Sequence, residues 1–189
     1  SAVKNIFWGF FFLFVNFNLT VNGHILNLLP PFVGCWLLYH GFEELRAESE
    51  RFYALRPFAV GLGIYTALIW IGDLLGVSTG SWISVLLGIV ASAGELYIAW
   101  GVIQGLREAE EHRQASLNTA AMYQAWMVLL VTQIAVYAIQ LMGLALWSLA
   151  AALAVVCILA GLVGIILFLV AVWRSRKLYE ALPPLQEEL

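Results

Sequence analysis

Long apolar segments, with every basic residue outside them or at their ends, constrain this sequence more than any other feature. About 20 helical residues, each rising about 1.5 Å, are needed to cross a hydrocarbon core of ~30 Å. Six segments approach or exceed this length: 5–21, 30–46, 57–76, 82–106, 120–143 and 146–173. The sequence therefore predicts an all-α fold, a polytopic membrane helix bundle with six transmembrane helices in a single domain over residues 1–189.

The basic residues predict how this bundle is oriented. If all six segments cross the bilayer, the nine Lys and Arg residues face one side, and the three loops on the other side hold none. Excess Lys and Arg mark cytoplasmic loops. We therefore predict that the N- and C-termini are both cytoplasmic. The basic residues are Lys4, Arg46, Arg51, Arg56, Arg107, Arg113, Arg174, Arg176 and Lys177.

Composition and motifs argue against several classes of function. Only 11% of the residues are charged, compared with about a quarter in soluble domains. The sequence lacks His-Glu-x-x-His, Gly-x-Ser-x-Gly, a phosphate-binding glycine loop and clustered Cys or His ligands. We therefore predict no catalytic residue, metal site or cofactor, and a membrane enzyme ranks behind other functions. No basic stretch is long enough to predict nucleic-acid binding.

Residues 22–31 leave two interpretations open. This segment is mostly apolar but carries Asn22, His24 and Asn27. It forms either a plain outer loop, which we favour, or a re-entrant segment that dips into the protein. Irregular backbone at membrane depth survives only where protein buries it or where it lines a wet cavity. Downstream, Pro31 is expected to start the second helix and Pro57 the third.

Glu95 is the most informative polar residue within a predicted span. It follows Trp82 by 13 residues, about 20 Å along a helix and past the bilayer midplane. A carboxylate at this depth is costly unless it is paired, hydrated or protonated. It could serve as a proton relay or cation ligand, or hold two helices together. His40 on the second helix is the expected partner, unless it extends toward the inner headgroups.

Further polar residues lie at helical spacing. Gln133, Tyr137 and Gln140 share a face of the fifth span and are expected to point inward, because lipid offers an amide no partner. Asp73 lies near the outer end of the third span, and Asn16 follows a phenylalanine-rich stretch that could line a pocket. Alternatively, these groups only cross-link helices. The candidate ligand- or proton-binding residues are Asn16, His40, Asp73, Glu95, Gln133, Tyr137 and Gln140.

Small residues at four-residue intervals complete the pattern. Ser84, Gly88 and Ser92 repeat in this way on the fourth span. Such repeats permit close approach between membrane helices, so we interpret them as internal packing positions.

Two resemblances accompany these patterns. The blocks FWGFFFLFVNFN and LLPPFVGCWLLYHGFEEL, over about a fifth of the chain, resemble the start of small integral-membrane proteins of Gram-positive bacteria. That resemblance implies a multi-pass protein of the bacterial cell (inner) membrane and brings no activity. In size and six-span layout the chain is also similar to S-components of energy-coupling-factor vitamin transporters. Those proteins carry an Ala-x-x-x-Ala docking motif on their first helix, whereas segment 5–21 contains no alanine.

The first functional hypothesis is a membrane protein that binds or transports a small molecule or ion between its helices. The alternative is a non-catalytic membrane regulator, sensor, or immunity or assembly subunit whose polar residues serve packing or a protein partner. The lipid bilayer is the one partner that the sequence itself predicts.

Overall fold

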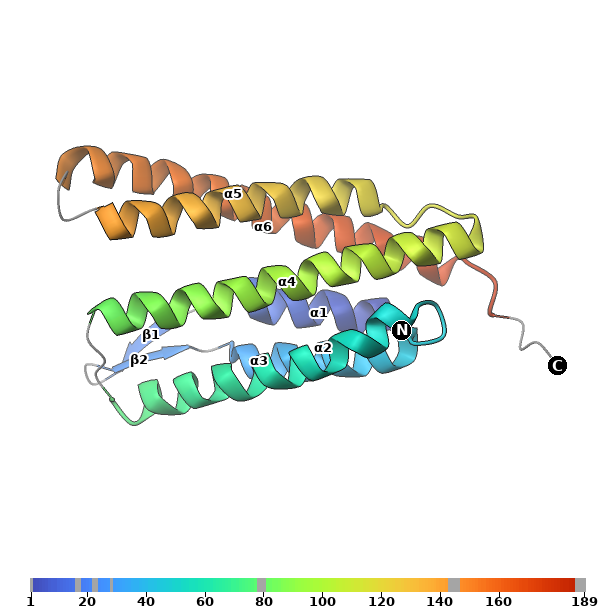
Figure 1. Cartoon of the computed structure of the whole chain (residues 1–189), viewed down its shortest axis with the longest axis horizontal. Helices are drawn as coiled ribbons and strands as arrows, with labels where there is room; N and C mark the ends of the chain where they lie inside the picture. The colour runs from blue at the N-terminus through green and yellow to red at the C-terminus, as the bar shows by residue number, and fades with distance from the viewer. Residues whose placement is uncertain are drawn as a thin grey trace.

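Six helices and one short β-hairpin make up the described parts of the computed structural model, which cover residues 2–15, 18–21, 24–27, 29–77, 81–142 and 147–185. The helices alternate in direction along the long axis of the molecule (Figure 1). In chain order, the elements are α1 (Ala2–Phe14), β1 (Asn18–Val21), β2 (His24–Asn27), α2 (Pro31–Leu45), α3 (Glu50–Leu74), α4 (Ser81–Arg113), α5 (Thr119–Met142) and α6 (Trp147–Glu180).

Four of these helices, α3 to α6, are long and apolar enough to cross a membrane. Their outward faces are apolar: Leu68 on α3, Ile134 on α5 and Val156 on α6 are each more than 60% exposed. Water disfavours so much exposed apolar surface, whereas lipid chains accept it. By length and composition, these four helices are compatible with a multi-pass integral membrane protein.

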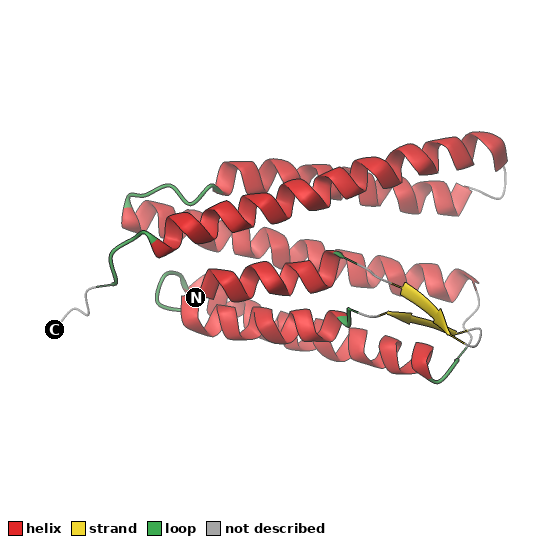
Figure 2. Cartoon of the chain, turned by 180° about the vertical axis from the view of Figure 1, so that it is seen from behind, coloured by secondary structure: helices red, strands yellow, loops and turns green. Residues whose placement is uncertain are grey.

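The six helices pack as a closed ring in sequence order. Each helix contacts the next, and α1 also contacts α6, where Phe10 and Phe168 meet edge to face with ring centroids 5.2 Å apart. Because neighbouring helices are antiparallel, all nine basic residues lie at one end of the bundle, which we call the charged end. The opposite end, which holds β1 and β2, is the hairpin end (Figure 2).

The first predicted span, 5–21, is helical only as far as Phe14; residues 18–21 form a strand. β1 pairs antiparallel with β2, with Asn18 opposite Asn27 and Val21 opposite His24. This register leaves the dipeptide Asn22-Gly23 between the strands, the sequence most typical of two-residue hairpin connections. The plain loop that we favoured for residues 22–31 is therefore wrong for 24–27. Residues 15–22 also include several Asn and β-branched residues, which form helices poorly.

The beginnings of α2 and α3 have different causes. Pro31 occupies the first turn of α2, where its missing N–H is harmless. α3 begins at Glu50, because the Ser49 side chain accepts a hydrogen bond from the Arg51 N–H at 3.2 Å and caps the helix. Pro57 therefore lies inside α3, and the prediction that it starts this helix is wrong.

The core is concentrated in the charged half of the bundle, where all six helices are present. Glycines bring helices into contact there: a Cβ added to Gly34 on α2 would lie 2.5 Å from the Gly9 carbonyl oxygen on α1. Likewise, a Cβ on Gly105 of α4 would lie 2.7 Å from the Phe52 ring of α3. This half is close-packed across the α1–α2 and α3–α4 interfaces.

Ion pairs and hydrogen bonds cross-link the charged end. Arg113 of α4 binds Glu48 through two nitrogens, at 2.5 and 3.2 Å, and the Tyr179 hydroxyl of α6 donates to the same carboxylate at 3.1 Å. The Glu48 side chain is only 1% exposed. The pKa of Tyr179 is raised to about 12, mainly because its hydroxyl is buried and secondly because the Glu48 carboxylate lies beside it. These contacts connect the α2–α3 turn to the ends of α4 and α6.

Candidate functional site

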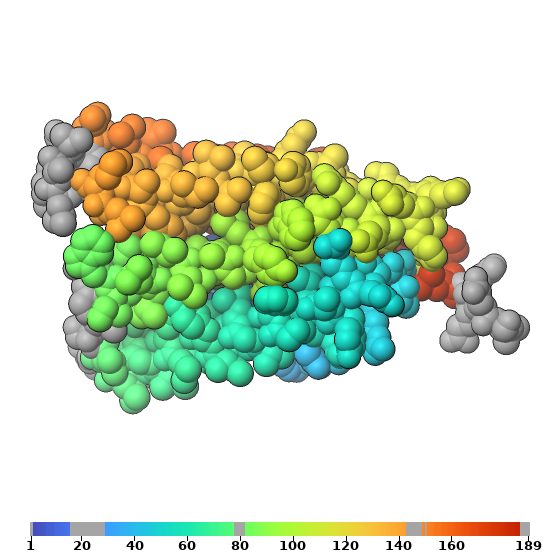
Figure 3. Space-filling view, viewed as in Figure 1, coloured from blue at the N-terminus to red at the C-terminus, as the bar shows by residue number. Residues whose placement is uncertain are grey.

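A cavity of about 790 Å³ occupies the hairpin half of the bundle, mainly between α3, α4 and α5. Its size falls within the range of ligand pockets. α4 lies between α3 and α5 on the face drawn in Figure 3. The residues that line the cavity are Leu13, Phe14, Pro31, Tyr65, Thr66, Leu68, Ile69, Trp70, Gly72, Asp73, Val77, Ser84, Leu87, Gly88, Ala91, Ser92, Glu95, Gln133, Tyr137 and Ile165.

The cavity exists because α1 and α2 are short. α1 ends at Phe14 and α2 begins at Pro31, and both of these residues lie on the cavity wall. Beyond this level the long helices α3 to α6 continue without helical partners from α1 and α2. On α4 the cavity extends from Ser84 to Glu95, about 16 Å along the helix axis.

Glu95 lies at the deep end of the cavity, nearest the charged half of α4. It is partly accessible and lines the cavity wall. Within the described part of the chain, no hydrogen bond or ion pair reaches its carboxylate. The thiol of Cys35, on α2, is an electrostatic neighbour of this carboxylate. An acidic group at membrane depth without a protein partner needs a proton, water or a ligand cation.

The wall between α4 and α5 is held by a hydrogen bond between two cavity residues. The Ser92 and Tyr137 hydroxyl oxygens are 2.9 Å apart. Gly88, one turn away on α4, makes room for this contact, because a Cβ there would lie 3.0 Å from the Tyr137 hydroxyl. On the α3 side, the Tyr65 hydroxyl donates to the Leu87 carbonyl at 2.7 Å. These bonds fix the Tyr65 and Tyr137 rings of the wall.

Asp73 supplies the second carboxylate of the cavity. It lies seven residues beyond Thr66 on α3, about 10 Å closer to the hairpin end, and it is exposed. Among the cavity-lining residues that the structure describes there is no Lys, Arg or His. The polar groups of the cavity are therefore acidic, hydroxyl and amide groups, and the remainder of the wall is aliphatic or aromatic.

The structure brings four of the predicted site residues together. Asp73, Glu95, Gln133 and Tyr137 come from three helices and line the one cavity. Gln140 is exposed near the end of α5 and is not part of the lining. Asn16 lies outside the described residues.

We expected His40 to pair with Glu95, but the two residues do not pair. It shares a face of α2 with Trp36, which is 62% exposed, and the two rings meet edge to face at 4.5 Å. Cys35, five positions earlier and 2% exposed, is one of the α2 residues that face the interior. Five residues correspond to about 140° of helix rotation beyond one turn, so the two side chains point in different directions.

Sequence reasoning missed the contribution of small residues to the cavity. Ser84, Gly88 and Ser92 were interpreted as packing positions only, but all three line the cavity, while Gly88 and Ser92 also contact Tyr137 of α5. Together with Glu95 they recur at intervals of four, four and three residues, on a single helix face. A stripe of small and polar residues that ends at an acidic residue is the signal that could have identified this wall.

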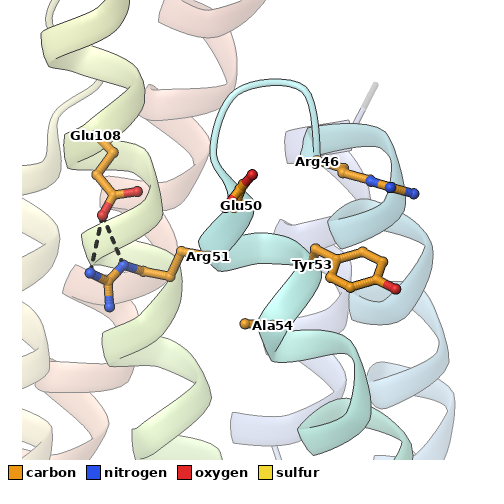
Figure 4. Close-up of a pocket in the computed structure, with 6 residues that line it drawn as sticks. All are labelled: Arg46, Glu50, Arg51, Tyr53, Ala54 and Glu108. Atoms are coloured by element: carbon orange, nitrogen blue, oxygen red, sulfur yellow. Dashed lines mark hydrogen bonds and ion pairs between the residues drawn. The ribbon is translucent and has the colours of Figure 1, made fainter.

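A second, open depression lies at the charged end between the start of α3 and α4 (Figure 4). Three of its four charged side chains, those of Arg46, Arg51 and Glu108, have partners. Arg51 forms an ion pair with Glu108 at 3.0 Å, and the Arg46 guanidinium lies 4.6 Å from the Tyr53 ring centroid. Hydrogen bonds from Ser49 and Arg51 lower the pKa of Glu108. This open surface, whose charges are mostly paired, is less suited to bind a ligand than the cavity around Glu95.

The fold and the cavity together define a class: a helical protein with the properties of a multi-pass membrane protein and an acidic, aromatic-walled cavity in one half of the bundle. Comparison with protein-family models, curated proteins and solved structures finds no match to the chain.

Proposed function

We propose that the chain is a six-span protein of the bacterial cell membrane, with both termini cytoplasmic, that binds or transports a small solute in the cavity around Glu95. The observation that carries this proposal is the carboxylate itself. It lines a cavity of about 790 Å³ and has no hydrogen-bond or ion-pair partner among the described residues. A group that only held helices together would be bonded to one of them.

Six crossings are compatible with the short first helices. α1 contributes 13 residues and β1 four, which correspond to about 20 Å of helix and about 13 Å of strand. Their sum matches a hydrocarbon core of ~30 Å, and β2 with α2 gives a similar length. In this proposal, the first crossing is a helix continued by a strand, and the second is a strand continued by a helix. The positive-inside rule places the charged end in the cytoplasm.

The packing supports access from the hairpin end. The cavity runs from Ser84, near the start of α4, to Glu95, and the close-packed charged half lies beyond it. A solute would therefore enter from the outer side. Passage into the cytoplasm would require the helices of the charged half to separate.

Substitution of Glu95 by Gln distinguishes a binding residue from a structural one. Because Glu95 has no partner to lose among the described residues, we expect E95Q to leave the unliganded protein as stable as the wild type or more stable. Trp126→Phe is the matched structural control, since it removes the hydrogen bond from the indole nitrogen to the Leu96 carbonyl at 2.9 Å, at a cost of about 1 kcal/mol. Thermal unfolding in detergent measures both. A loss of stability in E95Q equal to that in W126F would favour the regulator or assembly subunit.

Filling the cavity tests whether a solute binds there. Ala91 lines the cavity, whereas Ala93, two residues along α4, is exposed and does not. We expect the wild-type protein in nanodiscs to bind at least one of three ring probes of similar size, phenethylamine, phenethyl alcohol and hydrocinnamate, as measured by calorimetry. Ala91→Leu should abolish this binding, and Ala93→Leu, the same substitution outside the cavity, should preserve it. If no probe binds the folded wild-type protein, or if A91L binds as well as the wild type, the solute site is refuted.

A further inference from the structure

We propose that the solute of this cavity is a protonated amine with an apolar or aromatic body; this inference rests on the solute-binding function proposed above. The carboxylate of Glu95 would accept the ammonium N–H bonds at the deep end of the cavity. The aromatic wall would hold the remainder of the molecule.

The balance of charge in the cavity favours a cation. Asp73 and Glu95 are the acidic residues that lie away from the charged end in the described part of the chain, and both line this cavity. All basic side chains are at the other end of the bundle. An anionic solute would meet two carboxylates and no counter-charge, whereas a cation would neutralise Glu95 where the dielectric is low.

The aromatic wall favours an organic cation over a metal ion. Rings of Phe14, Tyr65, Trp70 and Tyr137 line the cavity, and the faces of such rings attract cations and pack against apolar groups. A bare metal ion would need several oxygen or nitrogen ligands close together. No cluster of three or more His, Cys, Asp or Glu residues suited to a metal occurs in the described ranges.

The arrangement along the axis suits an ammonium group that enters first. Asp73 lies near the hairpin end, and Glu95 lies deeper in the same cavity. The negative potential of Asp73 would concentrate cations near the entrance. At the deep end, the Ser92 and Tyr137 hydroxyl groups and the Gln133 amide offer acceptors beside Glu95. An ammonium group has three donors and no acceptor, which matches this set.

A charge series of probes tests the inference on the full chain in nanodiscs. Phenethylamine, phenethyl alcohol and hydrocinnamate have similar size and differ in charge at neutral pH. We expect the amine to bind at least about tenfold more tightly than the alcohol, and the carboxylate to bind most weakly. Glu95→Gln should reduce the preference for the amine at least about tenfold. Glu111→Gln, an exposed substitution at the charged end, should leave it unchanged.

The outcomes separate this inference from the proposed function. Equal binding of amine and alcohol, or tighter binding of hydrocinnamate, would refute the amine and leave the solute site intact. Retention of the full amine preference in folded E95Q would also refute it. If E95Q does not fold, the comparison of the three probes on the wild-type protein decides. Absence of binding by all three would refute the solute site itself.

Discussion

The buried ion pair between Glu48 and Arg113 gives the sharpest test of how the charged end is held together. The exposed fractions of the two side chains are 1% and 12%, and two hydrogen bonds join them. Arg113→Met would leave the Glu48 carboxylate buried, with the Tyr179 hydroxyl as its remaining partner. Removing one member of a buried pair costs about 3–5 kcal/mol, and we expect a loss in this range.

The matched control is a pair of the same type on the surface. Arg176 and Glu180 form an i,i+4 ion pair at 3.0 Å, with exposed fractions of 21% and 40%. Arg176→Met should therefore cost no more than about 1 kcal/mol. Reversible unfolding by SDS titration in mixed micelles gives the free energy of unfolding of each variant.

A double variant separates the ion pair from the packing around it. If both Arg113 and Glu48 are replaced by Met, no unpaired buried charge remains, so most of the lost stability should return. A cost of R113M no larger than that of R176M would refute the stabilising role of this pair. A double variant as unstable as R113M alone would refute it as well.

Two further predictions concern helix packing and pH. Gly34→Ala should destabilise the protein by at least about 1–3 kcal/mol, because its Cβ would meet the backbone oxygen of Gly9, whereas nothing lies within 4 Å of a Cβ on Gly61. Gly61→Ala should raise stability by up to about 1 kcal/mol. Equal changes in the free energy of unfolding for G34A and G61A, measured in an unfolding titration, would contradict this prediction. The lowered pKa of Glu108 contributes stability that is complete above the ordinary value of 4.5 and is lost as the pH falls through the folded-state pKa. Ser49→Ala removes the largest cause of that shift, so the pKa of Glu108, followed by carboxyl NMR, should move back toward its ordinary value; an unchanged pKa would refute the role of Ser49.

The long helices were predictable because hydrocarbon imposes one requirement on each of them. Segments 57–76, 82–106, 120–143 and 146–173 all lie within or largely within α3 to α6. Their boundaries at the charged end were not predictable from hydropathy, because α4 and α6 continue through polar residues as far as Arg113 and Glu180. Helix propensity, which hydropathy does not measure, allows these helices to continue beyond the apolar segments.

The first two segments show where local reasoning fails. The residues after Phe14 are apolar enough for a span, and only Asn22-Gly23 indicates a hairpin. β1 and β2 lie beside α3, and β2 contacts it. Hydropathy measures how strongly the side chains of a segment prefer an apolar environment to water. It cannot distinguish a helix from a strand that packs against a neighbouring helix.

The candidate site, too, was predictable from the sequence only in part. Sequence identified Asp73, Glu95, Gln133 and Tyr137 as polar residues at membrane depth, because each is costly there without a partner. Sequence also placed all the basic residues on one side, since that pattern depends only on their order between apolar segments. The pairing of His40 with Glu95 was not realised, because depth along a helix does not specify rotation about it.

Only the tertiary structure decided that these residues share a cavity. Where α1 and α2 end, and how α3, α4 and α5 turn toward one another, depends on contacts between residues far apart in the chain, such as Phe14 with Phe168 and Ser92 with Tyr137. A sequence specifies the chemistry of each side chain and its cost in lipid. The packing of helices against one another determines which side chains meet, and whether space remains between them for a solute.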